Sequence, residues 1–169
     1  MSVQDVLAGQ FRTLYGAAAR NLEGMSRQAS LVQPQPAGNC AAWILSHLVH
    51  VQNAVMEVVG SEPVWEGGGL AGPRSAPIVS GEGAPDWDEL RDRFLGSRDR
   101  CVEAIAALTD AALEDPLPGP FGDTTTRAGL LGFLAFHQAY HVGQLGMARR
   151  LAGLDGAIAG PAPREPAGA

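Results

Sequence analysis

Four stretches of the chain repeat apolar residues with the 3.6-residue period of an amphipathic α-helix, a pattern that points to an all-α fold. The first covers about residues 3–29 and stops before the Pro34 and Pro36 pair. The second follows Asn39, the expected N-cap, and ends at Gly60. Because no stretch shows a convincing two-residue alternation, we expect no β-sheet.

The third and fourth helices are expected in the second half of the chain. The third begins at Asp86, where an acidic N-cap followed by Glu89 resembles a capping box, and it ends near Thr109. A stretch rich in proline and glycine follows. The threonines at 124–126 then offer caps for a fourth helix that runs to about Leu151.

A long connection separates the second helix from the third. Residues 60–85 contain seven glycines and four prolines, so we expect an irregular crossover, of a length at which loops are often functional. Four helices with one long crossover are typical of a four-helix bundle. We expect one such domain over residues 1–153 and a flexible Gly/Ala/Pro-rich tail over residues 154–169.

Composition narrows the class of protein further. The 169 residues are 46% apolar, which is enough for one core without disulfide or metal staples. The formal charge of −6 and the lack of clustered Lys and Arg argue against nucleic acid as a partner. No apolar run approaches the roughly 20 residues that cross a bilayer, so no membrane is expected.

The cysteines and the first residues bear on the compartment. Cys40 and Cys101 show no pairing motif, and the first residues show no secretory signal. Both observations favour buried, reduced cysteines in the cytoplasm.

All four histidines fall on two of the predicted helices. His47 and His50 lie on the second helix, and His137 and His141 lie on the fourth. Because four positions make about one helical turn, His137 and His141 stand one above the other and can chelate a single ion. Their neighbours on the same face are apolar, as are those of His47, so we expect all three rings to point into the bundle.

Three converging imidazoles would form a metal site with an open position for water or substrate, the arrangement of catalytic zinc centres. The alternative is a set of core histidines hydrogen-bonded to their neighbours. Against it, three buried rings would need several polar partners in a core that offers few. A metalloprotease is disfavoured, because Gln138 stands where a zincin helix carries its catalytic Glu.

Two segments resemble the paired motifs of the DinB/YfiT-like family. They are N-C-A-A-W-I-L-S-H-L at 39–48 and H-Q-A-Y-H-V-G-Q-L at 137–145. In that family a His follows a Trp by four residues on the second helix, and H-x-x-x-H-x-G-Q lies on the last. The resemblance covers the helical body, roughly residues 3–153, and leaves the loops and the tail unmatched.

The resemblance implies a four-helix bundle that holds a divalent nickel, zinc or similar ion on His47, His137 and His141. Members of the family are often homodimers. Some are similar to transferases and isomerases that use a low-molecular-weight thiol, namely bacillithiol, mycothiol or glutathione, while most have no known substrate. Membership therefore defines the scaffold better than the reaction.

Three further side chains are candidates for a catalytic role beside the metal. His50 could serve as a fourth ligand or a proton shuttle, or lie at the helix boundary with its ring partly in water. Arg98, on the apolar stripe of the third helix, could bind an anionic group of a cofactor or substrate, or extend its head into solvent. Gln144, three positions after His141, could hydrogen-bond a ligand or contact the substrate, or simply pack.

These patterns favour an enzyme in which the metal binds and deprotonates a thiol or water, and the resulting anion attacks a small electrophilic molecule. The second hypothesis is a non-catalytic metal-binding or stress-response module, and the third is a purely structural bundle. An open fourth coordination position would favour the first hypothesis, and a closed site of four protein ligands the second.

Overall fold

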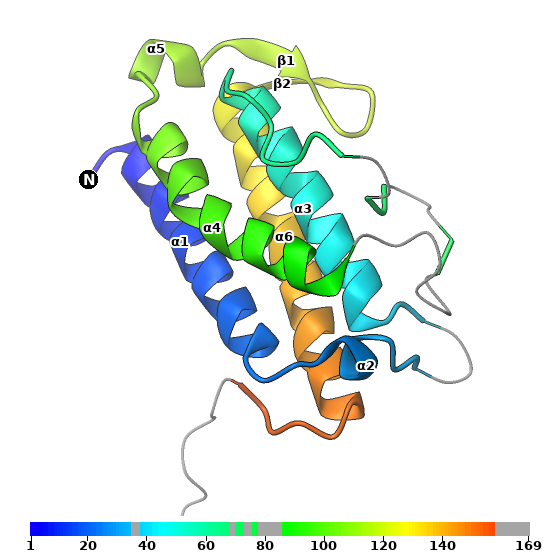
Figure 1. Cartoon of the computed structure of the whole chain (residues 1–169). Coiled ribbons are helices and arrows are strands. Elements are labelled where there is room, and N and C mark those ends of the chain that lie inside the picture. The colour runs from blue at the N-terminus through cyan, green and yellow to red at the C-terminus, as the bar shows by residue number, and fades with distance from the viewer. Residues whose placement is uncertain (35–37, 68–69, 73–75, 78–85, 158–169) are drawn as a thin grey trace, which may run out of the picture.

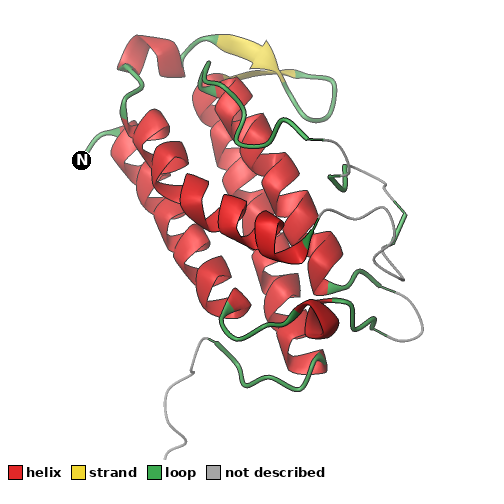
Figure 2. Cartoon of the chain, viewed as in Figure 1, coloured by secondary structure: helices red, strands yellow, loops and turns green. Residues whose placement is uncertain are grey.

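The computed structural model describes residues 1–34, 38–67, 70–72, 76–77 and 86–157. Within them four long helices dominate (Figures 1 and 2), and these are α1 (Val3–Leu22), α3 (Ala41–Val58), α4 (Trp87–Ala106) and α6 (Arg127–Leu151). Two single-turn helices, α2 (Arg27–Ser30) and α5 (Asp110–Leu113), lie at the ends of the bundle. The predicted all-α, four-helix architecture is confirmed.

The four long helices form a closed ring around one core. α1 packs against α4 and α6, and α3 packs against the same two helices, so α1 and α3 lie diagonally opposite (Figure 1). Large apolar side chains from every helix fill the centre, among them Phe11, Leu48, Phe94 and Leu145, all fully buried. Since α3 and α6 are direct neighbours, the histidine-bearing helices face each other.

Polar side chains from each long helix also meet inside the core. Ser97 of α4 donates to the Gln52 side chain of α3 at 3.1 Å, and the Gln138 amide of α6 donates to the Tyr15 hydroxyl of α1 at 3.4 Å. All four residues are buried. Because a buried polar group needs its partner, these two pairs favour one alignment of the helices over sliding alternatives.

The first helix ends earlier than predicted, at Leu22. Gly24 follows with a φ of 69°, in the left-handed region that favours glycine and commonly ends a helix. The hydroxyl of Ser26 then accepts the backbone N–H of Ala29 at 3.1 Å and caps α2. The apolar period continued past this break because Met25 is buried from the turn itself.

The predicted N-cap of the second long helix is wrong by one residue. Cys40 occupies the N-cap of α3, and its side chain makes no capping hydrogen bond. Every residue from 40 to 49 is buried, so packing rather than a side-chain cap holds this end of the helix. At the other end, Gly60 has a φ of 73° and lies where the helix was predicted to stop.

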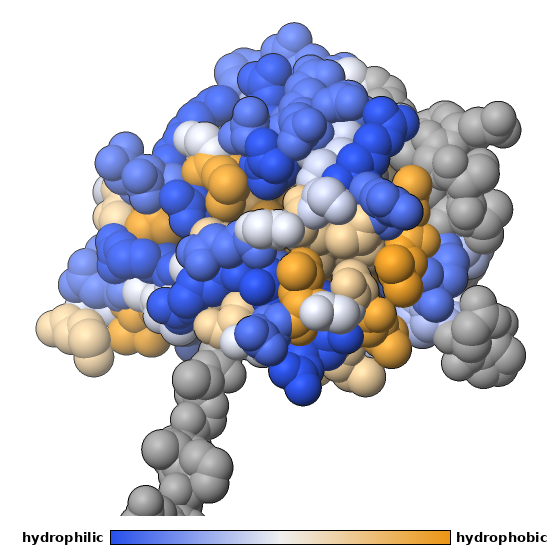
Figure 3. Space-filling model, turned by 60° about the horizontal axis from the view of Figure 1, so that its bottom comes forward, coloured by the Kyte–Doolittle hydropathy of each residue, from blue (hydrophilic) through white to orange (hydrophobic). Residues whose placement is uncertain are grey.

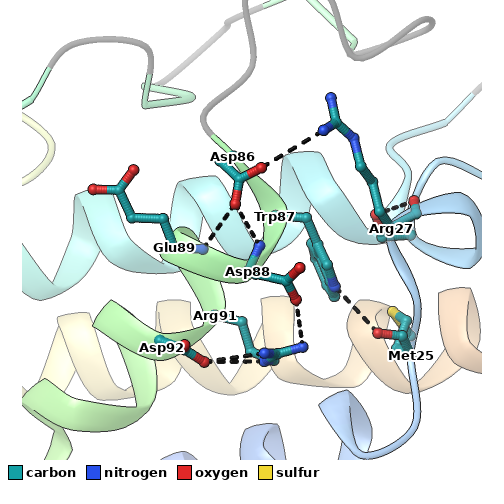
Figure 4. A network of polar contacts seen from close by, with 9 residues as sticks. Met25, Arg27, Asp86, Trp87, Asp88, Glu89, Arg91 and Asp92 are labelled. Carbon is teal, nitrogen blue, oxygen red and sulfur yellow. Dashed lines mark hydrogen bonds and ion pairs between the residues drawn. The ribbon is translucent and has the colours of Figure 1, made fainter.

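The start of α4 is tied to the turn that follows α1 (Figure 4). The Asp86 carboxylate accepts two backbone N–H groups of the first turn of α4, both at 3.0 Å, so the predicted acidic N-cap is confirmed. It also pairs with Arg27 of α2 at 3.6 Å, while the Trp87 indole donates to the Met25 carbonyl at 3.1 Å. The crossover therefore re-enters the bundle at a fixed point.

Between α4 and α6 the structure holds elements that the sequence pattern did not predict. α4 ends at Ala106, and the Thr109 side chain caps α5. A two-stranded antiparallel hairpin follows, formed by β1 (Pro116–Pro118) and β2 (Thr124–Thr126). Strands of three residues are too short to produce a detectable alternation. The Thr126 side chain accepts the Gly129 N–H and caps α6, as the threonine run predicted.

The described parts of the crossover lie against α3. Asn53 accepts the backbone N–H groups of Val64 and Trp65 at 2.9 and 3.1 Å and donates to the Trp65 carbonyl at 2.8 Å. Val64, Trp65 and Ala71 are buried, and the described residues of this segment are irregular, as predicted. The rest of the crossover and most of the predicted tail (158–169) lie outside the described residues, so the domain boundary at 153 stays a prediction.

Candidate metal centre

Three imidazole rings converge between α3 and α6. The ring centre of His47 lies 5.2 Å from that of His137 and 4.5 Å from that of His141, and the last two are 4.7 Å apart. One nitrogen from each ring lies within 4.8 Å of the others. His47 and His141 are buried and His137 is half-buried. The predicted convergence of three rings from two helices is therefore confirmed.

Hydrogen bonds fix the orientation of two of these rings. The Nδ1 atom of His47 lies 2.7 Å from the carbonyl oxygen of Ala71 in the crossover. A carbonyl can only accept, so His47 carries its proton on Nδ1 and leaves Nε2 free as a ligand. His141 Nδ1 lies 2.8 Å from Gln144 Oε1, which assigns the same tautomer to His141. Such outer partners are typical of metal-binding histidines.

His137 differs from the other two rings. Its Nδ1 atom is buried and has no hydrogen-bond partner within the described part of the chain. A buried polar atom without a partner lowers the stability of the fold by about 1–3 kcal/mol. An ion bound at this nitrogen would remove that cost. This orphaned nitrogen is the observation that fits a metal ion best, because a set of core histidines satisfied by their neighbours should not leave one.

Burial keeps the three rings neutral. Desolvation lowers the pKa of His47 and His137, and it lowers the pKa of His141 to about 4. Repulsion among the rings acts in the same direction, whereas the hydrogen bonds from Ala71 and Gln144 oppose it. Near pH 7 all three imidazoles are therefore neutral, which is the protonation state that binds a metal ion.

Aromatic side chains surround the histidines. The Trp43 ring stacks on His47 at 5.1 Å, Phe133 stacks on His137 at 6.0 Å, and Tyr140 meets His141 edge-on at 5.2 Å. This apolar shell limits water around the donors and lowers the local dielectric, which strengthens electrostatic interactions with a bound ion.

The structure brings two of the three predicted auxiliary residues near the site. Gln144 contacts His141 directly, as described above. The half-buried His50 ring stacks against His47 at 5.9 Å, but it is not part of the three-donor group. The Arg98 guanidinium donates to the Leu95 carbonyl at 2.9 Å, within its own helix, and the contact described for it does not reach the histidines.

A shallow groove adjoins the site at the end of the bundle where α3 begins and α6 ends. It measures about 280 Å³. The described residues that line it are Pro34, Gly38, Asn39, Ile44, Gln144, Met147, Ala148 and Leu151. Figure 3, which brings the lower side of the molecule forward, shows hydrophobic residues gathered near the middle of that face among hydrophilic ones. Gln144 thus touches both the groove and a candidate ligand.

Sequence reasoning missed the contribution of the crossover to the site. Ala71 supplies the carbonyl that orients His47, and its own N–H donates to the Ser46 hydroxyl at 2.7 Å. Trp43 adds a third link, because its indole donates to the Ala76 carbonyl at 3.1 Å. Ser46, a polar residue within an apolar run and beside His47, was the one available signal.

Both cysteines lie away from this chemistry. Cys40 and Cys101 form no disulfide and are fully buried, which confirms the prediction that they are packed in the core. Burial raises the pKa of Cys101 to about 11, so its thiol stays protonated and unreactive near neutral pH.

Fold and site together define a class: a four-helix bundle with three neutral histidines, on two adjacent helices, that could bind one metal ion. The comparison with known families agrees. Residues 10–145 match the DinB superfamily, and the chain belongs to that superfamily.

Solved structures support the fold. The chain is similar to the crystal structure of a conserved protein from Enterococcus faecalis, with a TM-score of 0.69 and 15% sequence identity over 90% of this chain and 98% of that one. No curated protein matches the sequence. Among the described residues, no helix combines the length and the apolar character that a membrane span requires.

Proposed function

We propose that the protein is a divalent-metal-dependent enzyme, a thiol S-transferase or a hydrolase that acts on a small electrophile. The observation that carries the proposal is the convergence of His47, His137 and His141 as three neutral donors, two of them held in the tautomer that leaves Nε2 free. Three protein ligands leave room for an exogenous one, as in catalytic rather than structural centres. Zinc and nickel are the ions that we favour, because both accept imidazole nitrogen.

A bound divalent ion would supply Lewis-acid chemistry, lowering the pKa of a thiol or water ligand and so making it nucleophilic at neutral pH. The chain's own residues would then orient the donors and exclude water. Gln144 holds His141, and the Trp43 and Phe133 rings shield the donors. His50, one ring away from His47, is the nearest further imidazole and would accept the proton that the nucleophile releases.

The groove beside Gln144 supports a small organic substrate. Its described lining is largely apolar, with the Asn39 and Gln144 amides as its polar groups. A cavity of about 280 Å³ is near the lower limit for small-molecule sites. We therefore propose a small, mostly apolar electrophile, attacked by a thiol of the bacillithiol, mycothiol or glutathione type. Arg98 keeps a proposed role in binding an anionic group of that thiol.

A non-catalytic metal-binding or stress-response role is the second candidate, and one observation favours it. The candidate ligands lie on two helices, and one of them is bonded to the crossover, so an ion would join three separate parts of the chain. Binding of this kind stabilises a fold by linkage, without any reaction. Turnover of thiol and electrophile separates the two candidates.

We also propose that the protein is a homodimer and that it lies in the cytoplasm. Exposed apolar side chains on α1 and α6, among them Val6, Phe136 and Met147, support the expected homodimer. Two cysteines that form no disulfide support a reducing compartment, which we take to be the cytoplasm.

The first test is the metal content of protein purified without a histidine tag. We expect close to one divalent ion per chain in the wild type and a loss of stoichiometric uptake in His137→Ala and in His141→Ala. His50→Ala is the matched control, because it removes a neighbouring imidazole outside the three-donor group, and it should keep its metal. Elemental analysis measures the metal content per chain of the wild type and the three variants. Full metal content in both ligand variants would end the proposal.

The second test asks whether the loaded protein is an enzyme. Wild-type protein with zinc or nickel should consume a low-molecular-weight thiol together with an epoxide or a haloaromatic compound, and His137→Ala should not. Thiol loss and product mass report the reaction. A metal-loaded protein that turns over no combination in a broad thiol panel would favour the non-catalytic candidate.

A further inference from the structure

One residue of the crossover, Ala71, is hydrogen-bonded through its N–H and its carbonyl to two consecutive residues of α3. The Ala71 N–H donates to the Ser46 hydroxyl at 2.7 Å, and the Ala71 carbonyl accepts from His47 Nδ1 at 2.7 Å. Ser46 is fully buried, and Ala71 is only 5% exposed. Both bonds are thus shielded from water. Because water cannot replace a lost bond there, losing either one leaves a buried polar group without a partner.

The geometry makes the two bonds depend on each other. Ser46 and His47 are neighbours on one helix, so their positions relative to each other are fixed by α3. Ala71, in contrast, lies in an irregular segment with no helix or strand to hold its peptide. The hydroxyl of Ser46 is the described side-chain partner of the Ala71 N–H, and by holding Ala71 in place this bond limits the directions open to the carbonyl that orients His47.

We propose that Ser46 is a positioning residue for the metal centre: by holding Ala71, it keeps His47 in the tautomer and orientation that bind the ion. As a result, metal binding and the docking of residues 70–72 on α3 stabilise each other. The inference rests on the proposed metal-binding function. It adds a residue whose hydroxyl acts on His47 through Ala71, and it makes the docking of residues 70–72 depend on bound metal.

The reciprocal effect follows from linkage. If a docked crossover increases metal affinity by some factor, bound metal increases the docking equilibrium by the same factor. Outer partners of metal-binding histidines typically contribute 10–100-fold to affinity. Ser46 acts through one intermediate residue, so we expect the lower part of that range.

The test compares Ser46→Ala with Asn53→Ala. Asn53 anchors the crossover through hydrogen bonds to Val64 and Trp65 and has no described hydrogen bond to Ala71 or His47, so this variant loosens the same segment elsewhere. Zinc affinity is measured by competition with a chromophoric chelator. We expect Ser46→Ala to bind zinc roughly 10-fold more weakly than the wild type and Asn53→Ala to stay within about 3-fold of it.

Hydrogen exchange of the Ala71 amide gives a readout independent of affinity. Zinc should slow this exchange in the wild type, and the effect should disappear in Ser46→Ala. If Ser46→Ala fails to fold, as judged by circular dichroism, Ala71→Pro replaces it in the zinc titration, because proline removes the same N–H from the crossover side and leaves α3 intact. Zinc affinity is then the readout, since proline has no amide hydrogen to exchange.

The possible results distinguish the role of Ser46 from the proposed metal-binding function. Equal zinc affinity in Ser46→Ala and the wild type, or an equal loss in Asn53→Ala, overturns the role of Ser46 and leaves the metal centre standing. Failure of the wild type to bind zinc, nickel or another divalent ion overturns the metal-binding function and this inference with it.

Discussion

At the scale of single residues, the three candidate ligands are prepared to different degrees. His47 and His141 each have a hydrogen-bond acceptor for Nδ1, whereas the Nδ1 atom of His137 is buried without a partner among the described residues. Two of the candidate ligands are therefore oriented by the chain itself, whereas the Nδ1 atom of His137 is left for an ion to satisfy.

Gln144 should control metal affinity through His141. In Gln144→Ala the ring loses the acceptor for Nδ1, and we expect zinc to bind about 10–100-fold more weakly. Gln144→Glu keeps an acceptor oxygen at the same reach and should bind at least as tightly as the wild type. Calorimetric titration of the metal-free proteins with zinc measures the affinity of the wild type and of both variants. Equal affinities in all three proteins would show that the His141 hydrogen bond has no influence on metal binding.

The sequence predicted the three candidate ligands but only one of their hydrogen-bond partners. His47, His137 and His141 could be grouped because helical spacing is a local property, and Gln144 is only three positions from the ring that it holds. Ala71 is 24 positions from His47, in a glycine-rich segment without periodicity, and its contribution comes from the backbone rather than from a side chain. No side-chain pattern can report which carbonyl a loop will present.

At the scale of elements, the helices and several of their ends could be predicted, but the early end of α1 could not. Apolar periodicity reports which face of a helix is buried, and that period continues through breaks such as Gly24, where a turn buries Met25 on the same side. The hairpin of β1 and β2 escaped prediction for a related reason. Its three-residue strands are held by their position against α6 and not by a pattern of their own.

Arg127 joins this hairpin to the rest of the bundle. Its guanidinium donates to the carbonyls of Val58 and Ala112 and pairs with the Asp115 carboxylate at 3.0 Å. The Val58 bond satisfies a carbonyl at the carboxyl end of α3, where a positive charge also complements the helix dipole. A single side chain therefore connects the α3 end, α5 and the start of α6.

Replacing Arg127 should destabilise the fold without removing the metal. We expect Arg127→Ala to lose about 2–3 kcal/mol of unfolding free energy, because two backbone carbonyls lose a charged donor. Arg127→Lys should lose less, since a lysine can keep one of the bonds. Urea unfolding measures the loss, and zinc content serves as the control. A variant as stable as the wild type would mean that water replaces these bonds at no cost.

At the scale of the whole molecule, the bundle is a frame that brings distant segments to one point. The architecture and the long crossover could be predicted because four amphipathic faces allow few other solutions. The polar pairs of the core could not, since Gln52 and Ser97 meet only once the helices are packed. The core and the candidate metal site are also neighbours in sequence, because His137 is followed by Gln138, which donates to Tyr15 of the adjacent helix α1.

The stability of the metal-free protein should fall in mild acid. Burial lowers the pKa of His47, His137 and His141 from an ordinary value of 6.5, and that of His141 to about 4. Below pH 6.5 the unfolded chain takes up protons that the folded chain resists. The stability that these neutral histidines contribute to the fold is therefore complete above pH 6.5 and is lost as the pH falls toward 4.

Urea unfolding of the metal-free protein at pH 7.5 and pH 5 measures this dependence. We expect a loss of at least ~1 kcal/mol, since one pKa unit corresponds to about 1.4 kcal/mol. His141→Gln should show a smaller loss, because it removes the group with the largest shift. Parallel behaviour of the two proteins would show that His141 is not held neutral by the fold.

The contact between Trp43 and His47 should let one of the three tryptophans report on the candidate metal site by fluorescence. The indole lies flat against an imidazole that we assign to the metal, and its N–H is bonded to the crossover. Its emission spectrum is therefore sensitive both to the charge on the ring beneath it and to the polarity of the segment above it. An open-shell ion such as nickel would quench that emission, whereas zinc would only shift its wavelength.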